Sequence, residues 1–472
     1  MKRYFFSQIR HQRYLLVLGD IFIISFSIII AYIISFAFFT RRPFYFSHIF
    51  DRLIPLASIL VFFIFIFYLI DLYEAEKIKN LFRCTTIIAF SVLIVSLISS
   101  SILFFFPKYI IGRRVVIINI PILICFLVLW RYIFINLVLE KEKLRRLALI
   151  GNADIISHFI DEFFRMGMAE FRITQICITG RGKKDKTSLA KSIPESVSVY
   201  KSIEDLLENE DFDILAFDYT QGEMSKEEIH RILELRFKGK FIYDFPSFYE
   251  ELTGKVPLNY IDSRWLLSEE ELQGKVSKFY SRLKKLLDIL FSATFLTITF
   301  PLCIFIALAI KLDSKGKILF AQERLGLRKQ PFICYKFRTM RMGAEEETGP
   351  KWSSKDDPRI TRVGKILRKT RLDELPQLWN ILKGNMSFVG TRPIRKYFAD
   401  QLTEMIPYYD LRFLVKPGLT GWAQVNQGYS GSEEGQFEKF QYELFYIKKM
   451  SIFLDLFIVF KTIKTVIKRK GE

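Results

Sequence analysis

Two adjacent carboxylates, Asp373 and Glu374, lie between Arg371 and a helix-like run from 376 to 382. Taken alone, the pair is typical of a helix N-cap, in which the Asp side chain accepts amide hydrogen bonds and Pro is tolerated in the first turn. The same helix start could instead receive a phosphate group, because its amide groups lack partners. Adjacent side chains on a helix diverge by about 100 degrees. Two such carboxylates therefore suit two different roles rather than one shared proton.

Basic residues occur around this pair in the last third of the chain: Lys336, Arg338, Arg371 and Arg392. A carboxylate that attacks a phosphate group meets repulsion unless cations neutralise it, so these residues indicate a pyrophosphate substrate. Each cation alone is typical of a solvated surface charge. Gly- and Pro-rich turns at 390–393 and 416–418 favour the functional interpretation, because rigid turns position side chains. No histidine follows His230, which leaves carboxylates, Lys, Arg or Tyr for chemistry in this part of the sequence.

The composition narrows the kind of protein that carries these residues. Half of the 472 residues are hydrophobic (50%), 48 are Phe, and the net charge is +19. These values exclude a disordered tail, and five scattered cysteines without a CxxC pair argue against a disulfide framework and a thiolate zinc site. At ~150 residues per domain, the chain forms about three units. The composition indicates a membrane protein that meets anionic headgroups or phosphorylated substrates, with nucleic acid as the alternative partner.

Four apolar stretches in the first third are long enough to cross a bilayer as helices: 21–39, 53–70, 84–106 and 115–139. The fourth contains Arg131, which must either reach the membrane surface or face a partner helix. Eleven basic residues flank the helices on the side of the N-terminus, and six flank them on the other side. The positive-inside rule then places the N-terminus and everything after residue 140 in the cytoplasm.

Residues from about 145 to 265 change to short apolar runs separated by amphipathic stretches, which predicts a Rossmann-like α/β domain with a parallel sheet. The first run ends at Gly151 and lacks the second and third glycines of GxGxxG, which let a backbone approach a pyrophosphate. The pattern favours a sheet retained for packing or regulation over one that binds a cofactor. The basic loop from Gly180 also lacks the spacing of a P-loop.

Residues 286–310 are long and apolar enough to span a membrane, but basic residues flank both ends and Pro301 interrupts the middle. Proline removes a helix hydrogen bond and bends the helix, so we predict a re-entrant helix at 283–310 that enters and leaves on the cytoplasmic side. The alternative is an ordinary fifth transmembrane helix. After 310, 19 Lys and 12 Arg face 7 Asp and 11 Glu. A basic amphipathic helix predicted at 446–469 lies along a membrane surface, so we expect no nucleic-acid partner.

The stretch from about 278 to 472 resembles the catalytic domain of the bacterial monotopic phosphoglycosyl transferases, also called bacterial sugar transferases or polyprenyl-phosphate hexose-1-phosphate transferases. Four helices and an α/β domain in front of it are similar to the large members. The order of the matching segments makes the resemblance specific. They are KKLLD at 284–288, GKILFAQERLG at 316–326, KFRTM at 336–340, DPRITRVGKILRKTRLDELPQLWN at 357–380, KGNMSFVGTRP at 383–393 and KPGLTGWAQVN at 416–426.

The resemblance implies transfer of a sugar-1-phosphate from a UDP-sugar, by expectation UDP-glucose or UDP-galactose, to polyprenyl (undecaprenyl) phosphate with release of UMP. It implies that Asp373 is the nucleophile and that Glu374 handles a proton and, with Asp373, Mg²⁺. Phosphate contacts then fall to Lys336, Arg338 and Arg392, to which the residue pattern adds Arg371. Glu443 and Asp455 occupy positions that are usually acidic, and the helix with Pro301 would anchor the domain. Asn385 and Glu443 depart from the commoner Asp, and Phe300 from the commoner Ser.

We therefore predict a membrane protein with α and α/β parts. Four transmembrane helices occupy 1–140, a degenerate Rossmann-like domain occupies 141–270, and a mainly helical monotopic catalytic domain with interfacial helices occupies 271–472. We expect a homodimer in the bacterial inner membrane, with the catalytic domain on the cytoplasmic face, that begins exopolysaccharide or O-antigen repeat-unit assembly. Two alternatives stay open: a nucleotide-sugar dehydratase or epimerase built on the α/β domain, and a non-enzymatic scaffold of polysaccharide assembly.

Overall fold

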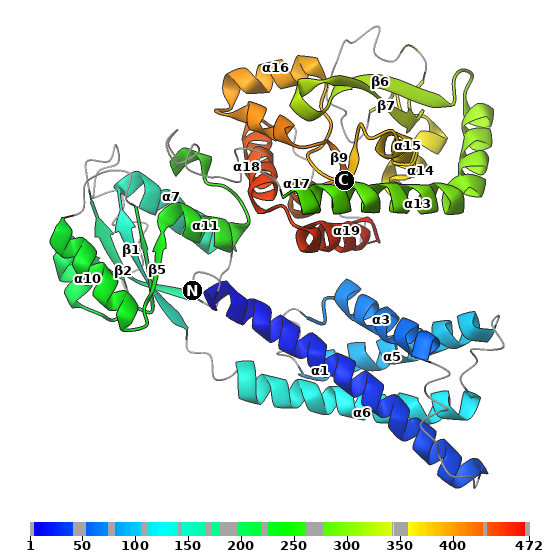
Figure 1. Cartoon of the computed structure of the whole chain (residues 1–472), viewed down its shortest axis with the longest axis horizontal. Helices are drawn as coiled ribbons and strands as arrows, with labels where there is room; N and C mark the ends of the chain where they lie inside the picture. The colour runs from blue at the N-terminus through cyan, green and yellow to red at the C-terminus, as the bar shows by residue number, and fades with distance from the viewer. Residues whose placement is uncertain are drawn as a thin grey trace. The chain divides into compact units, whose positions relative to one another are not determined.

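The computed structural model shows two compact units, which are described separately (Figure 1). They are Met1–Arg145 with Ala169–Phe171, and Arg146–Met168 with Arg172–Glu472. The predicted domain boundary at 270 and the basic loop from Gly180 lie outside the described residues. The structure describes residues 4–40, 53–73, 81–104, 112–139, 144–166, 171–179, 197–218, 225–260, 277–341, 343, 357–427 and 432–467.

The first unit consists of apolar helices. They are α1 (Tyr4–Ser35), α3 (Leu53–Leu69), α5 (Leu81–Phe104) and α6 (Arg113–Phe134), with π-helical extensions Phe36–Thr40 and Ile135–Leu139. By length and composition, α1, α5 and α6 could each cross a membrane, whereas α3 is shorter. All four predicted stretches are therefore helical. Their buried faces share one core, in which Ile24, Phe67, Val92 and Leu127 are fully enclosed.

Arg131 faces a partner helix, which is one of the two alternatives that the sequence left open. Its guanidinium donates hydrogen bonds to both carboxylate oxygens of Asp20 on α1, at 2.7 and 2.8 Å. Neither side chain is exposed. A buried charge among apolar helices is tolerated when it is paired and hydrogen-bonded, so this pair joins α6 to α1.

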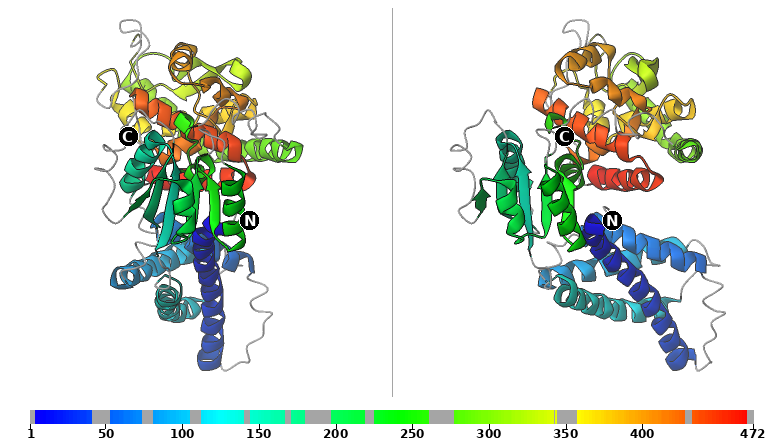
Figure 2. Two further views of the ribbon diagram at one scale, coloured as in Figure 1. Left: turned by 90° about the vertical axis from the view of Figure 1, so that its left-hand side faces the viewer. Right: turned by 60° about the vertical axis from the view of Figure 1, so that its left-hand side comes forward.

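The α/β part of the second unit contains a five-stranded sheet in the order β3-β2-β1-β4-β5. β1 pairs with β4, β2 with β3, and β4 with β5 in parallel, and the strands run side by side in Figure 2. Each predicted apolar run forms a strand, while β3 has only three residues and was not predicted. The strands are β1 (Arg145–Gly151), β2 (Phe171–Ile178), β3 (Ser198–Tyr200), β4 (Ile214–Phe217) and β5 (Phe241–Asp244).

Helices cover both faces of this sheet, as a doubly wound parallel sheet requires (Figure 1). Leu206 of α9 (Ile203–Glu208) and Leu235 of α10 (Lys226–Phe237) are buried in one core with strand residues. Phe159 of α7 (Ala153–Met166) packs against Phe245 of α11 (Phe245–Thr253) with ring centroids 5.1 Å apart. The predicted α/β architecture is confirmed.

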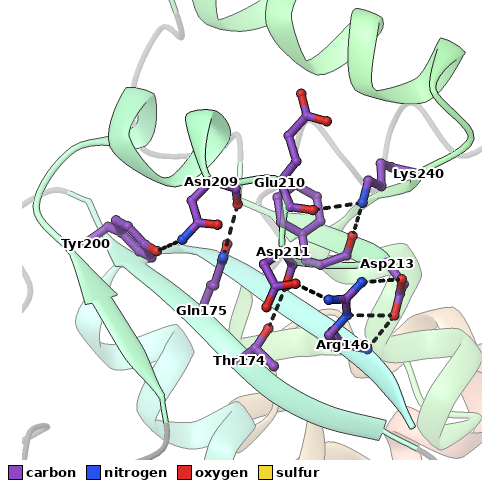
Figure 3. A network of polar contacts seen from close by, with 10 residues as sticks. Arg146, Thr174, Gln175, Tyr200, Asn209, Glu210, Asp211, Asp213 and Lys240 are labelled. Carbon is purple, nitrogen blue, oxygen red and sulfur yellow. Dashed lines mark hydrogen bonds and ion pairs between the residues drawn. The ribbon is translucent and has the colours of Figure 1, made fainter. Parts of the chain in front are cut away.

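A polar network lies where β1 and β4 begin (Figure 3). Arg146 forms ion pairs with Asp211 and Asp213, and its backbone amide donates to Asp213 at 2.9 Å. Lys240 donates to the carbonyl oxygen of Glu210 at 2.8 Å. These charged and polar groups form ion pairs and hydrogen bonds with one another at the amino ends of the strands. Ligands of parallel sheets bind at the opposite, carboxyl ends. The network therefore holds the loop before β4 in place.

The remaining part of the second unit is mainly helical, as predicted. Its longest helix is α13 (Lys278–Asp313), and two strands, β6 (Leu319–Leu325) and β7 (Pro331–Phe337), form an antiparallel hairpin. A second, parallel pair joins β8 (Ser387–Val389) to β9 (Gly418–Thr420). The other helices are α14 (Arg362–Thr370), α15 (Gln377–Leu382), α16 (Lys396–Met405), α17 (Trp422–Asn426), α18 (Glu433–Lys449) and α19 (Ile452–Ile467).

α13 and α19 carry apolar side chains that the protein does not cover. α13 is one helix that contains Pro301, and its ribbon changes direction part-way along in Figure 1. Only 11% of the most hydrophobic stretch of α13 is buried inside the protein. Phe453 of α19 is 87% exposed. The length and composition of α13 would allow it to cross a membrane.

The prediction of a single helix at 446–469 is wrong. α18 ends at Lys449 and α19 begins at Ile452, because the hydroxyl of Ser451 accepts a hydrogen bond from the amide of Leu454 at 3.2 Å and so caps a new helix. The apolar stripe is nevertheless present on α19, where Phe457 and Phe460 are exposed.

Candidate active site

Asp373 and Glu374 lie in a short 3-10 turn, Leu372–Glu374, between α14 and α15. Arg371, which precedes the turn, adopts a left-handed conformation with φ 58° and ends α14. Leu372 packs with Leu367 and Phe337, so the apolar residue of the turn is anchored beneath α14. Both carboxylates are buried, each with 8% of its residue surface exposed.

The N-cap interpretation of the acidic pair is wrong. Pro376, rather than Asp373, occupies the cap position of α15, and no side chain there makes a capping hydrogen bond. α15 has six residues, so its helix dipole contributes little positive potential. The two buried carboxylates therefore depend on nearby side-chain cations.

Glu374 is the paired member of the two carboxylates. Its Oε1 lies 2.8 Å from Lys336 Nζ and 3.1 Å from Arg392 Nη2. Burial alone would raise the pKa of Glu374, but the charges of Lys336, Arg392 and Arg371 outweigh burial and hold the pKa well below its usual range. The surroundings of Glu374 therefore favour its ionised form.

Asp373 is the unpaired member. Its Oδ1 is buried and has no hydrogen-bond partner within the described residues. Burial and the neighbouring charge of Glu374 raise the pKa of Asp373, against the opposing charges of Lys336, Arg371 and Arg368. An ionised oxygen that no donor occupies is what a nucleophile needs, and a raised pKa makes its anion more basic.

Lys336 is held opposite Glu374 by the contact between β7 and α15. The side chain of Asn380 on α15 accepts a hydrogen bond from the amide of Tyr335 at 3.0 Å and donates to the carbonyl of Ile333 at 2.6 Å. These two bonds fix the strand that carries Lys336 against the helix that follows Glu374.

Arg392 is held by a buried ion pair behind it. Arg412 donates to both oxygens of Glu443 at 3.0 Å and to the carbonyl oxygen of Arg392 at 2.8 Å. Glu443 also accepts from the amide of Arg392 at 3.3 Å. Glu443 is thus a support of Arg392 rather than a second carboxylate at Asp373.

The turn that carries Arg392 depends on close backbone contact. A Cβ at Gly390 would lie 2.2 Å from the carbonyl oxygen of Lys416, and a Cβ at Gly418 would lie 2.1 Å from the amide nitrogen of Gly390. The two Gly- and Pro-rich segments singled out in the sequence therefore lie side by side, as β8 and β9 and the turns beside them. Only glycine allows this approach.

Three other predicted residues lie in different surroundings. Arg338 donates to the carbonyl oxygens of Ser314 at 2.7 Å and Lys315 at 2.9 Å, just beyond the end of α13. Asp455 accepts from Tyr280 at 2.8 Å, Lys284 at 2.7 Å and Tyr446 at 2.7 Å, which joins α19 to α13 and α18. Pro301 lies inside α13. In this arrangement Arg338 and Asp455 connect elements instead of contacting the acidic pair.

Arg412 was missed in the sequence. It is 1% exposed and stacks over the ring of Tyr409, at 5.0 Å from the centroid. Its partner Glu443 lies 31 residues away along the chain, and no local motif includes both. A buried arginine cannot be told from a surface arginine without the fold.

The acidic pair can accept a divalent cation. Asp373 offers a free buried oxygen and Glu374 stays ionised, which is a suitable donor set for a hard cation. In the part of the chain that the structure describes, no group of three or more His, Cys, Asp or Glu could hold a metal. Mg²⁺ commonly binds through one or two carboxylates together with water and substrate phosphates, so these two residues fit it.

A known protein family matches the part of the chain that contains the acidic pair, and several known proteins are similar to this chain. Residues 279–469 match the family described as bacterial sugar transferase. A UDP-N-acetylgalactosamine-undecaprenyl-phosphate N-acetylgalactosaminephosphotransferase of Aeromonas hydrophila is 40% identical over 227 residues, which are 48% of this chain and 52% of that protein. A UDP-glucose:undecaprenyl-phosphate glucose-1-phosphate transferase of Escherichia coli (strain K12) is 40% identical over 183 residues, 38% of this chain and 39% of that protein.

An undecaprenyl-phosphate galactose phosphotransferase of Salmonella typhimurium is 34% identical over 278 residues, 55% of each protein. The chain thus spans between 39% and 55% of the length of these three relatives. The matched residues include the whole cluster around Asp373 and Glu374. Residues 279–469 therefore form a domain of the bacterial sugar transferase family, which confirms the resemblance that the motifs indicate.

Proposed function

We propose that this protein transfers a hexose-1-phosphate from a UDP-sugar to polyprenyl phosphate and releases UMP. One observation carries the proposal: Asp373 presents a buried oxygen without a hydrogen-bond partner among the described residues, beside the ionised Glu374 and its two cations. The arrangement puts a nucleophilic oxygen next to cations that can bind a phosphate group. The named activities of the three relatives agree with this chemistry.

The reaction has two displacements at the same phosphorus. In the first, Asp373 Oδ1 forms a bond to the sugar-bearing phosphorus, the bond to the bridging diphosphate oxygen breaks, and UMP leaves with that oxygen. In the second, a phosphate oxygen of the lipid bonds to this phosphorus, and the Asp373 oxygen leaves as the carboxylate. The products are UMP and a polyprenyl diphosphate sugar, and the enzyme returns to its first state.

The cations make the first displacement possible. Lys336 and Arg392 share Glu374 in the free protein, and a phosphate bound beside Asp373 would offer them additional oxygens. Mg²⁺ bound by Asp373 and Glu374 would supply Lewis-acid stabilisation of the phosphate charge. The charges of Lys336, Arg392 and Arg371 lower the pKa of Glu374 and favour its ionised form, so we assign it to orientation and charge.

We assign the lipid-facing surface to α13 and α19. Their exposed apolar side chains, including Phe295, Phe305, Phe457 and Phe460, suit the interior of one leaflet. The flanking charges support a re-entrant α13 and a catalytic domain on the cytoplasmic face of the bacterial inner membrane. There the protein would carry out the first membrane step of exopolysaccharide or O-antigen repeat-unit assembly, as a homodimer.

The alternative of a dehydratase or epimerase on the α/β domain has less support. The side chain of Asn152 accepts a hydrogen bond from the amide of Ile155 at 2.8 Å, at the start of α7. The helix start that would bind a pyrophosphate in a dinucleotide enzyme is therefore capped by the chain itself.

The experiment uses the full-length protein in membranes with polyprenyl phosphate, Mg²⁺ and a panel of UDP-glucose, UDP-galactose and their N-acetylated forms. We expect release of UMP with one or more donors and none from Asp373→Asn. Release of UDP, or full activity of Asp373→Asn, would refute the mechanism. A folded protein that releases UMP from none of these donors would favour the alternative of a non-enzymatic scaffold.

A further inference from the structure

Lys439 is a charged side chain near the site that no contact explains. It precedes Glu443 by one turn of α18, so the two side chains share one face of the helix. Both carboxylate oxygens of Glu443 already accept hydrogen bonds from Arg412, and one of them also accepts from the backbone amide of Arg392. Across the described residues, Lys439 has no hydrogen bond or ion pair, although it is partly buried.

The surroundings of Lys439 hold more positive than negative charge. The groups that act on it are Glu443 from its own helix and Arg412, Arg392 and Arg324 from neighbouring elements. Arg324, on β6, donates to the carbonyl oxygen of Pro393 at 3.4 Å, directly after Arg392. Arg392 in turn contacts Glu374. The group of cations is therefore continuous with the site at Asp373.

A partly buried ammonium group without a partner is costly, and an excess of cations around it attracts an anion. Burial and the three arginines lower the pKa of Lys439 to about 8, against the charge of Glu443. The donor of the proposed reaction carries two phosphates. One is attacked by Asp373, and the other must lie one bridging oxygen away and needs cations of its own.

We propose that Lys439 binds the phosphate that departs with UMP, and that Arg324 assists it. This inference rests on the proposed function for its place in the reaction. It adds a binding residue outside the motifs that mark the acidic pair. Contact with the departing phosphate also stabilises the charge that develops on the leaving group.

The test measures binding of UMP and of uridine to the detergent-solubilised full-length protein by calorimetry. We expect Lys439→Gln to weaken UMP binding roughly tenfold or more, because a hydrogen bond to a charged group is lost, and Lys439→Arg to retain most of it. Binding of uridine, which lacks the phosphate, should change in neither variant. The matched control is Lys396→Gln, an exposed lysine of α16.

The pH dependence gives a second measurement. UMP affinity of the wild type should fall as pH rises through about 8, where Lys439 loses its proton, and the fall should be absent in Lys439→Gln. Equal UMP affinities of wild type and Lys439→Gln with the same pH profile would overturn the inference. If Lys439 controls UMP binding but UDP-sugars yield no UMP, the proposed reaction fails and the binding site stands. A wild type that does not bind UMP refutes both.

Discussion

Asp373 and Glu374 are neighbours in sequence but differ in charge environment. Glu374 is paired with Lys336 and Arg392, whereas Asp373 keeps a free oxygen. Replacing Asp373 with Asn keeps the shape and removes the nucleophilic charge, so we expect release of UMP to fall at least roughly a thousandfold. The measurement is UMP release together with trapping of a radiolabelled sugar phosphate on the protein. Asp400→Asn, at an exposed position on α16, is the control and should retain both signals.

The acid side of the pH profile tests the role of Lys336. In the proposed reaction Asp373 must be ionised to attack, and its pKa is raised by burial and by Glu374 but lowered by Lys336. Loss of that cation in Lys336→Gln should raise the pKa further and move the acid limb of kcat/KM to higher pH. The opposite shift, or none, would contradict this assignment. Lys396→Gln should keep the limb of the wild type.

At the residue scale, the motifs singled out Lys336 and Arg392, and the structure places both against Glu374. Their roles could not be separated from the sequence. Arg338 has the same local signature as Lys336, yet it contacts the carbonyl oxygens of Ser314 and Lys315. The difference arises because Lys336 lies within β7 whereas Arg338 follows the end of the strand at Phe337, and because α13 ends at Asp313, just before the two carbonyl groups that Arg338 contacts.

At the scale of elements, short apolar runs predicted the strands well, because burial on both faces of a parallel sheet demands such runs. The break between α18 and α19 was missed, because the apolar spacing continues through Met450 while the cap at Ser451 acts locally. The sequence also gives little information on the shape of α13. The composition of α13 is that of a membrane helix, and in the sequence only Pro301 and the charges at both ends argue for a bend.

The topology of α13 gives the element-scale prediction. In a re-entrant helix both ends lie on one side, so single cysteines at Lys278 and Lys317 should react with a membrane-impermeant reagent from the cytoplasmic side only. Lys317 is chosen over Gly316, whose φ of 124° disfavours a side chain. The five native cysteines are first replaced by serine or alanine. Labelling of the two positions from opposite sides would establish an ordinary crossing.

At the scale of the second unit, α18 connects the α/β part to the active site. Its Glu443 supports Arg392, while the carbonyl oxygen of Gln441 accepts from the amide of Val256 at 3.1 Å. Trp422 donates to the carbonyl oxygen of Gly254 at 2.8 Å. Val256 and Leu258 are buried in the same core as residues of α16 and α18. The segment after α11 thus belongs to the packing of the catalytic part, which no sequence pattern indicated.

The ion pair between Glu250 of α11 and Lys448 of α18 tests this connection. The two groups are 2.9 Å apart, and their side chains are 2% and 4% exposed. Glu250→Ala removes the carboxylate that pairs with a buried lysine, so we expect a loss of about 3–5 kcal/mol of stability. The double variant Glu250→Leu with Lys448→Met removes both charges and should recover most of that loss. Thermal unfolding of the full-length protein in detergent measures both, and the exposed pair Lys396–Asp400 is the matched control. If Glu250→Ala unfolds like the wild type, the pair does not hold α11 to α18, and the connection rests on the hydrogen bonds and apolar contacts of the segment after α11.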